Sequence, residues 1–408
     1  MLQRLLLATL LTTGIATGIT GQASAACAYR NTVALKTLSA GFDAWKAVTA
    51  AWAECGNVQS ELDQEFRRKQ PTAFAANPAL YQIGGVANNT IVPLLNAGTI
   101  RPLDDLVAKY GQQLTPNQLI RVDGKIMAVA MMVNTQHFMY REDLLKELAI
   151  PVPTTWDEVL DASARIKASG KVQYPLGATM KPGFDISQEF INMFLGFGGV
   201  PVKADNTPSF NTEAGVKALT MMKAISAYMD PEFLTSESTF VARQFQQSKI
   251  AMSNLWASRA GSLESAAESQ VVGKVVMAAA PAAMKGGKPA TTLWWDGFVI
   301  AKNITDAEAE AAFRVAMEGI DEEMVKANNN TAVWLIKGYT PGRSAVGAIA
   351  SAMAGAPNYP STSAMGLVSA AAGESVADFM TGKKTAEKTL IDMEANYLLR
   401  AKEQGLVK

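Results

Sequence analysis

Hydrophobic and polar positions alternate along the first ninety residues in a way that predicts strands followed by helices. The predicted elements are a strand over 32–38, a helix over 42–55, and strands over 58–62 and 80–84. The helix carries Trp45, Val48 and Trp52 at helical spacing. Strand–helix–strand order favours a parallel α/β sheet, whose ligands bind at the carboxyl ends of the strands. The loops at 39–43 and 84–89 are therefore expected to border a site.

The same alternation resumes after an uncharged segment, 129–138, which predicts a buried strand that crosses between two parts of the molecule. A loop is expected at 180–185. The remaining predicted elements are helices over 155–168, 211–229 (capped by Asn211), 305–319, 364–371 and 386–402, and strands over 174–178, 250–256, 275–279 and 291–301. About 380 mature residues exceed what one core supports, so two discontinuous domains are expected.

The N-terminus has the pattern of a secretory signal. Arg4 precedes an apolar run and an Ala-x-Ala site at 23–25, which predicts a signal peptide over 1–25 and an exported product. A membrane anchor would need a longer apolar span. Cys27 leaves lipid attachment open, although the usual leucine three residues earlier is absent. After export, Cys27 and Cys55 could form a disulfide or remain as thiols.

Composition removes several classes of function. The 37 basic and 37 acidic residues balance, and no basic stripe indicates nucleic acid or anionic membrane as a partner. His137 is the only histidine, which excludes most Ser-His-Asp hydrolases and three-histidine zinc sites. Asp205 begins a segment like a calcium loop, but the twelfth position holds no glutamate. No cofactor or metal is expected. A carboxylate pair for glycoside hydrolysis stays open because its spacing is spatial.

Short motifs then suggest a family. In chain order they are Asp123-Gly124-Lys125, Tyr140 to Leu144, Ile150-Pro151, Pro153 to Glu158, Lys249 to Met252 with Trp256, Trp295 to Ile300, and Thr340 to Arg343. This order resembles the extracellular solute-binding proteins of ABC importers, in the sugar-binding group similar to maltose-binding protein (family 1). The glycine that usually precedes the Ile-Pro pair is replaced by Ala149.

The resemblance implies an α/β fold of the periplasmic-binding-protein type, with two lobes, a multi-segment hinge and a ligand cleft. The expected lobes are 26–133 with about 298–342, and 134–297 with about 343–408. It implies a periplasmic monomer, not an enzyme, that closes on a neutral sugar, oligosaccharide or polyol and delivers it to a membrane permease. The alternatives are an anionic sugar or sugar phosphodiester held by Arg343 or Lys181, a secreted carbohydrate-active enzyme, and an adaptor that binds no solute.

Sugar chemistry nominates the candidate binding residues. Flat aromatic rings bind the C–H face of a sugar, while Asp, Asn and Arg pair with its hydroxyls. Adjacent side chains of a strand point to opposite sides, so either Trp294 or Trp295 faces the cleft, and Asp296 shares the side of Trp294. The other candidates are Asp43, Asn134, Phe184, Asp185, Trp256, Trp334 and Arg343. Each also has a structural alternative, such as a helix cap for Asp43 or a hinge amide for Asn134.

Overall fold

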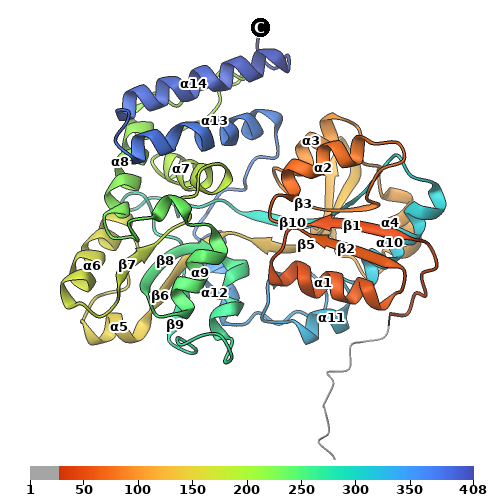
Figure 1. Ribbon diagram of the computed structural model, residues 1–408, viewed down its shortest axis with the longest axis horizontal. Helices are drawn as coiled ribbons and strands as arrows, with labels where there is room; N and C mark the ends of the chain where they lie inside the picture. The colour runs from red at the N-terminus through yellow and green to blue at the C-terminus, as the bar shows by residue number, and fades with distance from the viewer. Residues whose placement is uncertain (1–26) are drawn as a thin grey trace, which may run out of the picture.

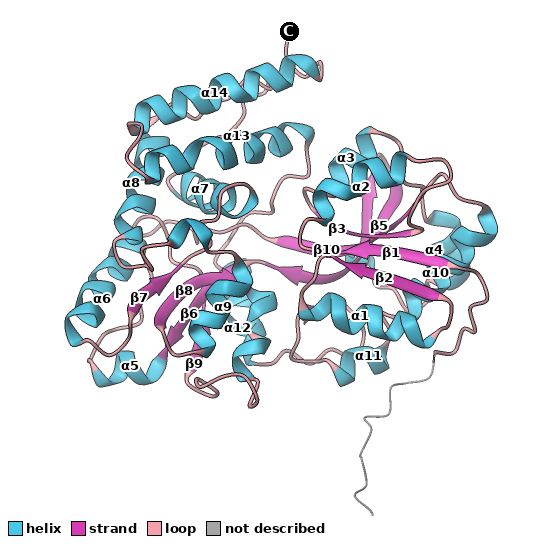
Figure 2. Cartoon of the chain, in the orientation of Figure 1, coloured by secondary structure: helices cyan, strands magenta, loops and turns pink. Residues whose placement is uncertain are grey.

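The chain folds around two separate β-sheets, one in each of two lobes (Figure 1). The computed structural model describes residues 27–408. The expected signal peptide, 1–25, lies outside the described residues. Helices cover both faces of each sheet (Figure 2), which matches the predicted α/β class. The two-lobed fold expected from the sequence is confirmed.

The larger sheet has the strand order β11-β5-β10-β3-β1-β2, with β4 paired to β5. β1 is parallel to both β2 and β3, whereas β10 runs antiparallel to β3 and β5. In Figure 1, α1 and α11 cover one side of this sheet, and α2 and α3 cover the other. The strands are β1 Leu35–Ser39, β2 Val58–Leu62, β3 Ile83–Ala87, β4 Leu119–Val122, β5 Lys125–Asn134, β10 Trp294–Ile300 and β11 Val333–Trp334. The helices are α1 Asp43–Glu54, α2 Phe66–Ala75, α3 Ile91–Asn96, α4 Asp104–Tyr110, α10 Asp306–Glu318 and α11 Glu322–Ala327.

The smaller sheet has the order β7-β8-β6-β9, and its largest hydrophobic core lies between the sheet and helices α7, α8, α13 and α14. The strands are β6 Gln136–Arg141, β7 Tyr174–Gly177, β8 Ile250–Trp256 and β9 Val275–Ala278. The helices are α5 Glu142–Glu147, α6 Trp156–Ser169, α7 Phe184–Gly196, α8 Glu213–Ser226, α9 Ser238–Gln246, α12 Val346–Met353, α13 Ser363–Met380 and α14 Ala386–Glu403.

The crossing segment predicted as one strand over 129–138 is two strands, β5 and β6, that belong to different sheets. The break falls at Thr135, which is fully buried, and its hydroxyl donates to the Thr292 carbonyl at 2.8 Å. The sequence assigns residues 294–297 to the second lobe. The structure places them in the larger sheet, because β10 is paired with β5 from Trp294 onward.

Three other local predictions differ from the structure. The third strand is 83–87, not 80–84, because residues 83–87 are the ones that pair with residues 296–300 of β10. Residues 184 and 185 begin α7 and are not in a loop. The cap of α8 is not Asn211 but Thr212, whose hydroxyl accepts from the Gly215 amide at 3.3 Å.

A disulfide joins Cys27 to Cys55 and ties the start of the described chain to the end of α1. The two thiols that the sequence left open are therefore paired. Within residues 27–408, no helix is both long and apolar enough to cross a bilayer.

Candidate functional site

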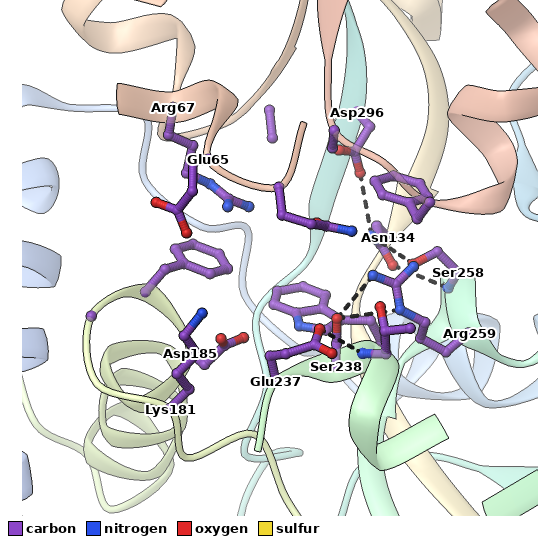
Figure 3. A pocket seen from close by; sticks show the side chains of 18 of the residues that line it. Glu65, Arg67, Asn134, Lys181, Asp185, Glu237, Ser238, Ser258, Arg259 and Asp296 are labelled. Atoms are coloured by element: carbon purple, nitrogen blue, oxygen red, sulfur yellow. Dashed lines mark hydrogen bonds between the residues drawn. The ribbon is translucent and has the colours of Figure 1, made fainter. Parts of the chain in front are cut away.

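A cavity of about 830 Å³ lies between the two lobes (Figure 3). The larger lobe lines it with residues that follow the carboxyl ends of its three parallel strands, as the sheet topology requires. They are Ala40 and Phe42 after β1, Gln64, Glu65, Arg67 and Arg68 after β2, and Ala87 at the end of β3. The two crossing strands β5 and β10 add Asn134, Trp294 and Asp296.

The smaller lobe lines the cavity with two helix N-termini and the end of one strand. Lys181 to Asp185 lie at the start of α7, and Glu237 to Thr239 at the start of α9. Trp256 ends β8, and Ser258 and Arg259 follow it. Glu237 caps α9 by accepting from the backbone amides of Thr239 and Phe240, both at 2.8 Å. The carboxylate of Glu237 is thus already occupied by its own helix.

Three aromatic rings form one wall. The Trp256 and Trp294 rings meet edge to face at 5.6 Å between centroids, and Phe184 lies 6.3 Å from Trp256 and 6.0 Å from Trp294. Tyr359 covers Trp294 at 4.0 Å. The Trp294 indole N–H donates to Thr292 at 2.9 Å, so this ring is fixed and its polar atom is satisfied inside the protein. The wall offers apolar surface to a ligand.

Two arginines reach across the cleft in opposite directions. The guanidinium of Arg67, from the larger lobe, lies 4.1 Å from the ring centroid of Phe184 in the smaller lobe. The guanidinium of Arg259, from the smaller lobe, lies 5.1 Å from the Phe42 ring in the larger lobe. Such cation–π contacts are favourable, more so when they are desolvated. These two Arg–Phe pairs, here called the cross-lobe bridges, connect the lobes directly.

Both arginines keep hydrogen-bonding capacity. Arg259 donates to the Ser238 hydroxyl from Nε at 3.2 Å and Nη2 at 2.9 Å. Arg67 has a buried Nε without a hydrogen-bond partner, and neither arginine forms an ion pair within the described chain. Burial lowers the pKa of both guanidiniums, while Asp185 and Asp296 oppose that effect. A solute with hydrogen-bond acceptors would satisfy these donors.

Two carboxylates face the same space. Burial raises the pKa of Asp296 to about 6. The Asn134 amide, which donates to Asp296 at 3.3 Å, and the charges of Arg67 and Arg259 act in the opposite direction and lower this pKa. Burial also raises the pKa of Asp185 to about 6, and Arg67 is the largest opposing influence. The oxygens of both carboxyl groups can accept hydrogen bonds from a ligand.

The structure brings six of the ten predicted residues to the cavity. They are Asn134, Phe184, Asp185, Trp256, Trp294 and Asp296. The choice between the adjacent tryptophans is thereby resolved: Trp294 lines the cavity, and Trp295 packs on the other side of the sheet with a separate hydrophobic cluster.

The structure places the other three predicted residues outside the cavity. Asp43 is exposed in the first turn of α1 and pairs with Lys46 at 2.9 Å. Trp334 is buried in the larger lobe and donates to the Asn328 carbonyl at 2.9 Å. Arg343 donates to the Val275 carbonyl at 3.2 Å. Each of these side chains has a local structural partner, and none faces the solute space.

Sequence reasoning missed Arg67, Arg259 and Glu237. Applying the carboxyl-end rule to the predicted strand 58–62 would have nominated the segment that follows it and contains Arg67. Arg259 lies three residues beyond the nominated Trp256. Glu237 left no comparable signal, because α9 was not predicted. Within the described residues, no group of three or more His, Cys, Asp or Glu side chains is placed to hold a metal.

Two hinged α/β lobes with a polar, aromatic cavity between them define a solute-binding protein. The chain belongs to the bacterial extracellular solute-binding protein family, whose model matches residues 37–318. The resemblance drawn from the sequence motifs is therefore confirmed.

Solved structures share this fold. A solute-binding protein of an ABC transporter from Agrobacterium radiobacter, in complex with ribitol, is 20% identical with a TM-score of 0.80, covering 90% of this chain and 99% of that one. One from Agrobacterium vitis with bound D-mannitol has 19% identity and a TM-score of 0.76, with 91% and 99% covered. A maltose-bound protein of T. maritima has 19% identity and a TM-score of 0.77, with 89% and 99% covered.

A curated relative from Sinorhizobium fredii is named a probable amino-acid ABC transporter periplasmic-binding protein. It is 24% identical over 172 residues, which cover 41% of this chain and 39% of the relative. The match thus spans about two-fifths of that protein's length, and its activity does not transfer to this chain as a finding.

Proposed function

We propose that this protein is the periplasmic substrate-binding component of an ABC importer, and that it captures a sugar or sugar alcohol between its lobes and delivers it to the permease as a monomer. The observation that carries the proposal is the set of charged groups in the interlobe cavity whose hydrogen-bonding capacity the protein leaves partly unused. Arg67 and Arg259 offer donors, and Asp185 and Asp296 offer acceptors. A hydroxyl both donates and accepts, so a polyhydroxylated solute satisfies all four groups.

The charge balance of the cavity supports a neutral solute. The lining holds four cationic and four anionic side chains, which are Arg67, Arg68, Lys181 and Arg259 against Glu65, Asp185, Glu237 and Asp296. An anionic sugar would leave part of this acidic set uncompensated. The aromatic wall supports a ligand with an apolar face, which sugars present. The ribitol, D-mannitol and maltose bound by proteins of the same fold agree with this ligand class.

The mechanism follows from the two lobes. A solute that bonds to groups of both lobes at once stabilises the closed form by the difference between its affinities for the closed and open forms. Arg67 and Asp185 belong to opposite lobes, as do Asp296 and Arg259. The closed form would then be the one that the permease recognises.

A zwitterionic amino acid is the second candidate. Its ammonium group would meet Asp185 or Asp296, and its carboxylate would meet Arg67 or Arg259. The presence of both cationic and anionic side chains in the cavity lining favours this candidate over a purely anionic solute.

A thermal-shift screen tests the proposal. The exported protein would be heated with pentitols, hexitols, aldoses, ketoses, short oligosaccharides, sugar phosphates and amino acids. A solute at one hundred times its Kd adds about 2.7 kcal/mol to the stability of the folded state, which raises the melting temperature clearly. We expect a shift with a neutral sugar or polyol. A shift with amino acids alone would select the second candidate, and no shift with any sugar or polyol would contradict the proposal.

A further inference from the structure

We propose that the cavity is built for a solute of a single sugar unit, either a monosaccharide or an acyclic sugar alcohol, and that the two cross-lobe bridges limit the length of what it accepts. This inference rests on the proposed function and names the substrate class within it. The cavity volume does not decide the matter. At about 830 Å³ it falls in the ordinary range of small-molecule sites and would hold more than one sugar unit.

The first support is the aromatic wall. Successive units of an oligosaccharide need successive ring surfaces on which to stack, but here the rings pack against each other. Trp256, Trp294 and Phe184 lie within 6.3 Å of one another between centroids. One face of Trp294 is also covered by Tyr359 at 4.0 Å. The wall is therefore a single platform, with room for one sugar ring or one extended polyol.

The second support is the placement of the bridges. Figure 3 shows Arg67 and Arg259 on opposite sides of the cavity. At each side the guanidinium lies on a ring of the opposite lobe, at 4.1 Å for Arg67 on Phe184 and 5.1 Å for Arg259 on Phe42. A longer chain that extends between the lobes toward either of these sides meets one bridge. It would then displace a bridge that helps to hold the lobes together.

The third support is the chemistry at the crossing strands. Asp296 is only 9% exposed, and the Asn134 amide at 3.3 Å is its one hydrogen-bond donor among the described residues. A free hydroxyl can donate to this carboxylate, whereas the ether oxygen of a glycosidic bond cannot. Sites built to bond a hydroxyl strongly reject analogues that lack it, because the buried partner is left unpaired. Extending the solute at this end is therefore disfavoured.

Isothermal titration of the exported, ligand-free protein tests the inference. The panel would hold ribitol, D-mannitol, D-glucose and D-tagatose, together with maltose and maltotriose. We expect the preferred single-unit solute to bind at least a hundredfold more tightly than maltotriose. Equal or tighter binding of maltotriose would overturn the length limit and leave the proposed function standing. Binding of amino acids with no sugar or polyol bound would overturn both.

A pair of variants tests the role of the bridges. Arg67→Ala removes one bridge, and Arg121→Ala removes an exposed arginine of the same lobe on β4, outside the cavity. In the wild type, the single-unit solute is expected to bind more tightly than maltotriose by a certain factor. We expect Arg67→Ala to reduce that factor at least tenfold, and Arg121→Ala to leave it unchanged. If Arg67→Ala weakens every solute by the same factor, Arg67 is a ligand contact but does not limit length. Circular dichroism confirms that each variant is folded.

Discussion

Two groups of buried polar residues differ in how far the protein itself satisfies their hydrogen bonding. The first group is the crossing cluster, Gln136, Glu189, Asn192 and Thr292. Gln136 donates to Glu189 at 2.8 Å and accepts from Asn192 at 2.7 Å, and Thr292 donates to Asn192 at 3.0 Å. Each side chain of this cluster is bonded to the next.

The second group consists of the cavity residues Arg67, Asp185 and Asp296. The buried Nε of Arg67 has no partner, and Asp296 has only a 3.3 Å contact with Asn134. Buried polar groups are normally paired inside the protein, so unpaired ones at a cavity indicate that a ligand completes them. Both groups are buried, so burial alone does not identify binding residues. What separates the two groups is whether the protein supplies the partner.

The largest expected effect concerns the crossing cluster. Gln136→Ala should lower the free energy of unfolding by about 3 kcal/mol, because buried Glu189 loses one of its two donor residues and keeps only Thr179, while the buried Asn192 amide loses its acceptor. Urea denaturation monitored by tryptophan fluorescence measures the loss. A decrease below about 1 kcal/mol would show that this cluster is no better satisfied than the cavity.

The next effect concerns the cavity. Asp296→Asn should weaken solute binding by about 30- to 100-fold, as expected for a lost hydrogen bond to a charged group. It should not lower the melting temperature at neutral pH, because burial already disfavours the ionised carboxylate, whose pKa is raised to about 6. Titration calorimetry and thermal melting give the two readouts. Asp43→Asn is the matched control and should leave affinity unchanged. A loss of stability equal to that of Gln136→Ala would erase the contrast between the groups.

A smaller effect concerns the charge of Glu189 in the crossing cluster, which can be separated from its hydrogen bonding by the pH dependence of stability. Burial raises the pKa of Glu189 to about 7 from 4.5, so the folded state holds a proton that the unfolded state has lost between these two values. Stability should therefore fall as the pH rises from about 4.5 to 7 and stay lower above that range. Glu189→Gln keeps an acceptor for Gln136 and Thr179 and removes the charge.

The variant should thus gain about 2 kcal/mol over the wild type near pH 8, and little near pH 4.5. Urea denaturation at the two pH values measures the difference. An equal change at both pH values would mean that the raised pKa is not responsible.

The smallest expected effect is the pH dependence of binding. Asp185 and Asp296 both have a pKa raised to about 6, so lowering the pH from about 7.5 to 5.5 protonates most of each. A protonated carboxyl accepts hydrogen bonds more weakly, and affinity for a neutral sugar should fall about tenfold. Titrations across this range check the sign. An affinity that rises on acidification would point to an anionic solute.

Much of the fold was predictable from the sequence because its strongest patterns are local. The helix at 42–55, the strands at 58–62 and 250–256, and the helices at 155–168 and 305–319 formed where they were predicted, to within one residue at each end. The break at Thr135 was not visible. Its neighbours on both sides are apolar or amide, and only pairing with two different sheets divides the segment.

Only part of the candidate site could be predicted from the sequence, for a related reason. Trp294 and Asp296 lie on a recognisable strand, where alternation fixes the side that each residue faces. Arg67 lies on α2, a polar helix that contains Pro71. Because such a helix has no apolar repeat, the sequence pattern does not predict it. Trp334 and Arg343 looked equally suitable in sequence. Their buried or backbone-bonded positions depend on tertiary contacts that composition does not reveal.

A polyhydroxylated solute is expected to complete the hydrogen bonding of the four charged cavity residues Arg67, Arg259, Asp185 and Asp296. The most direct test is a crystal structure of the protein with the solute that gives the largest thermal shift. We expect this solute to lie between the lobes, with its hydroxyls donating to Asp296 and Asp185 and its oxygens accepting from Arg67 and Arg259. Its apolar face should lie on Trp256 or Trp294. A solute bound elsewhere, or one in the cavity that contacts none of these four charged side chains, would contradict it.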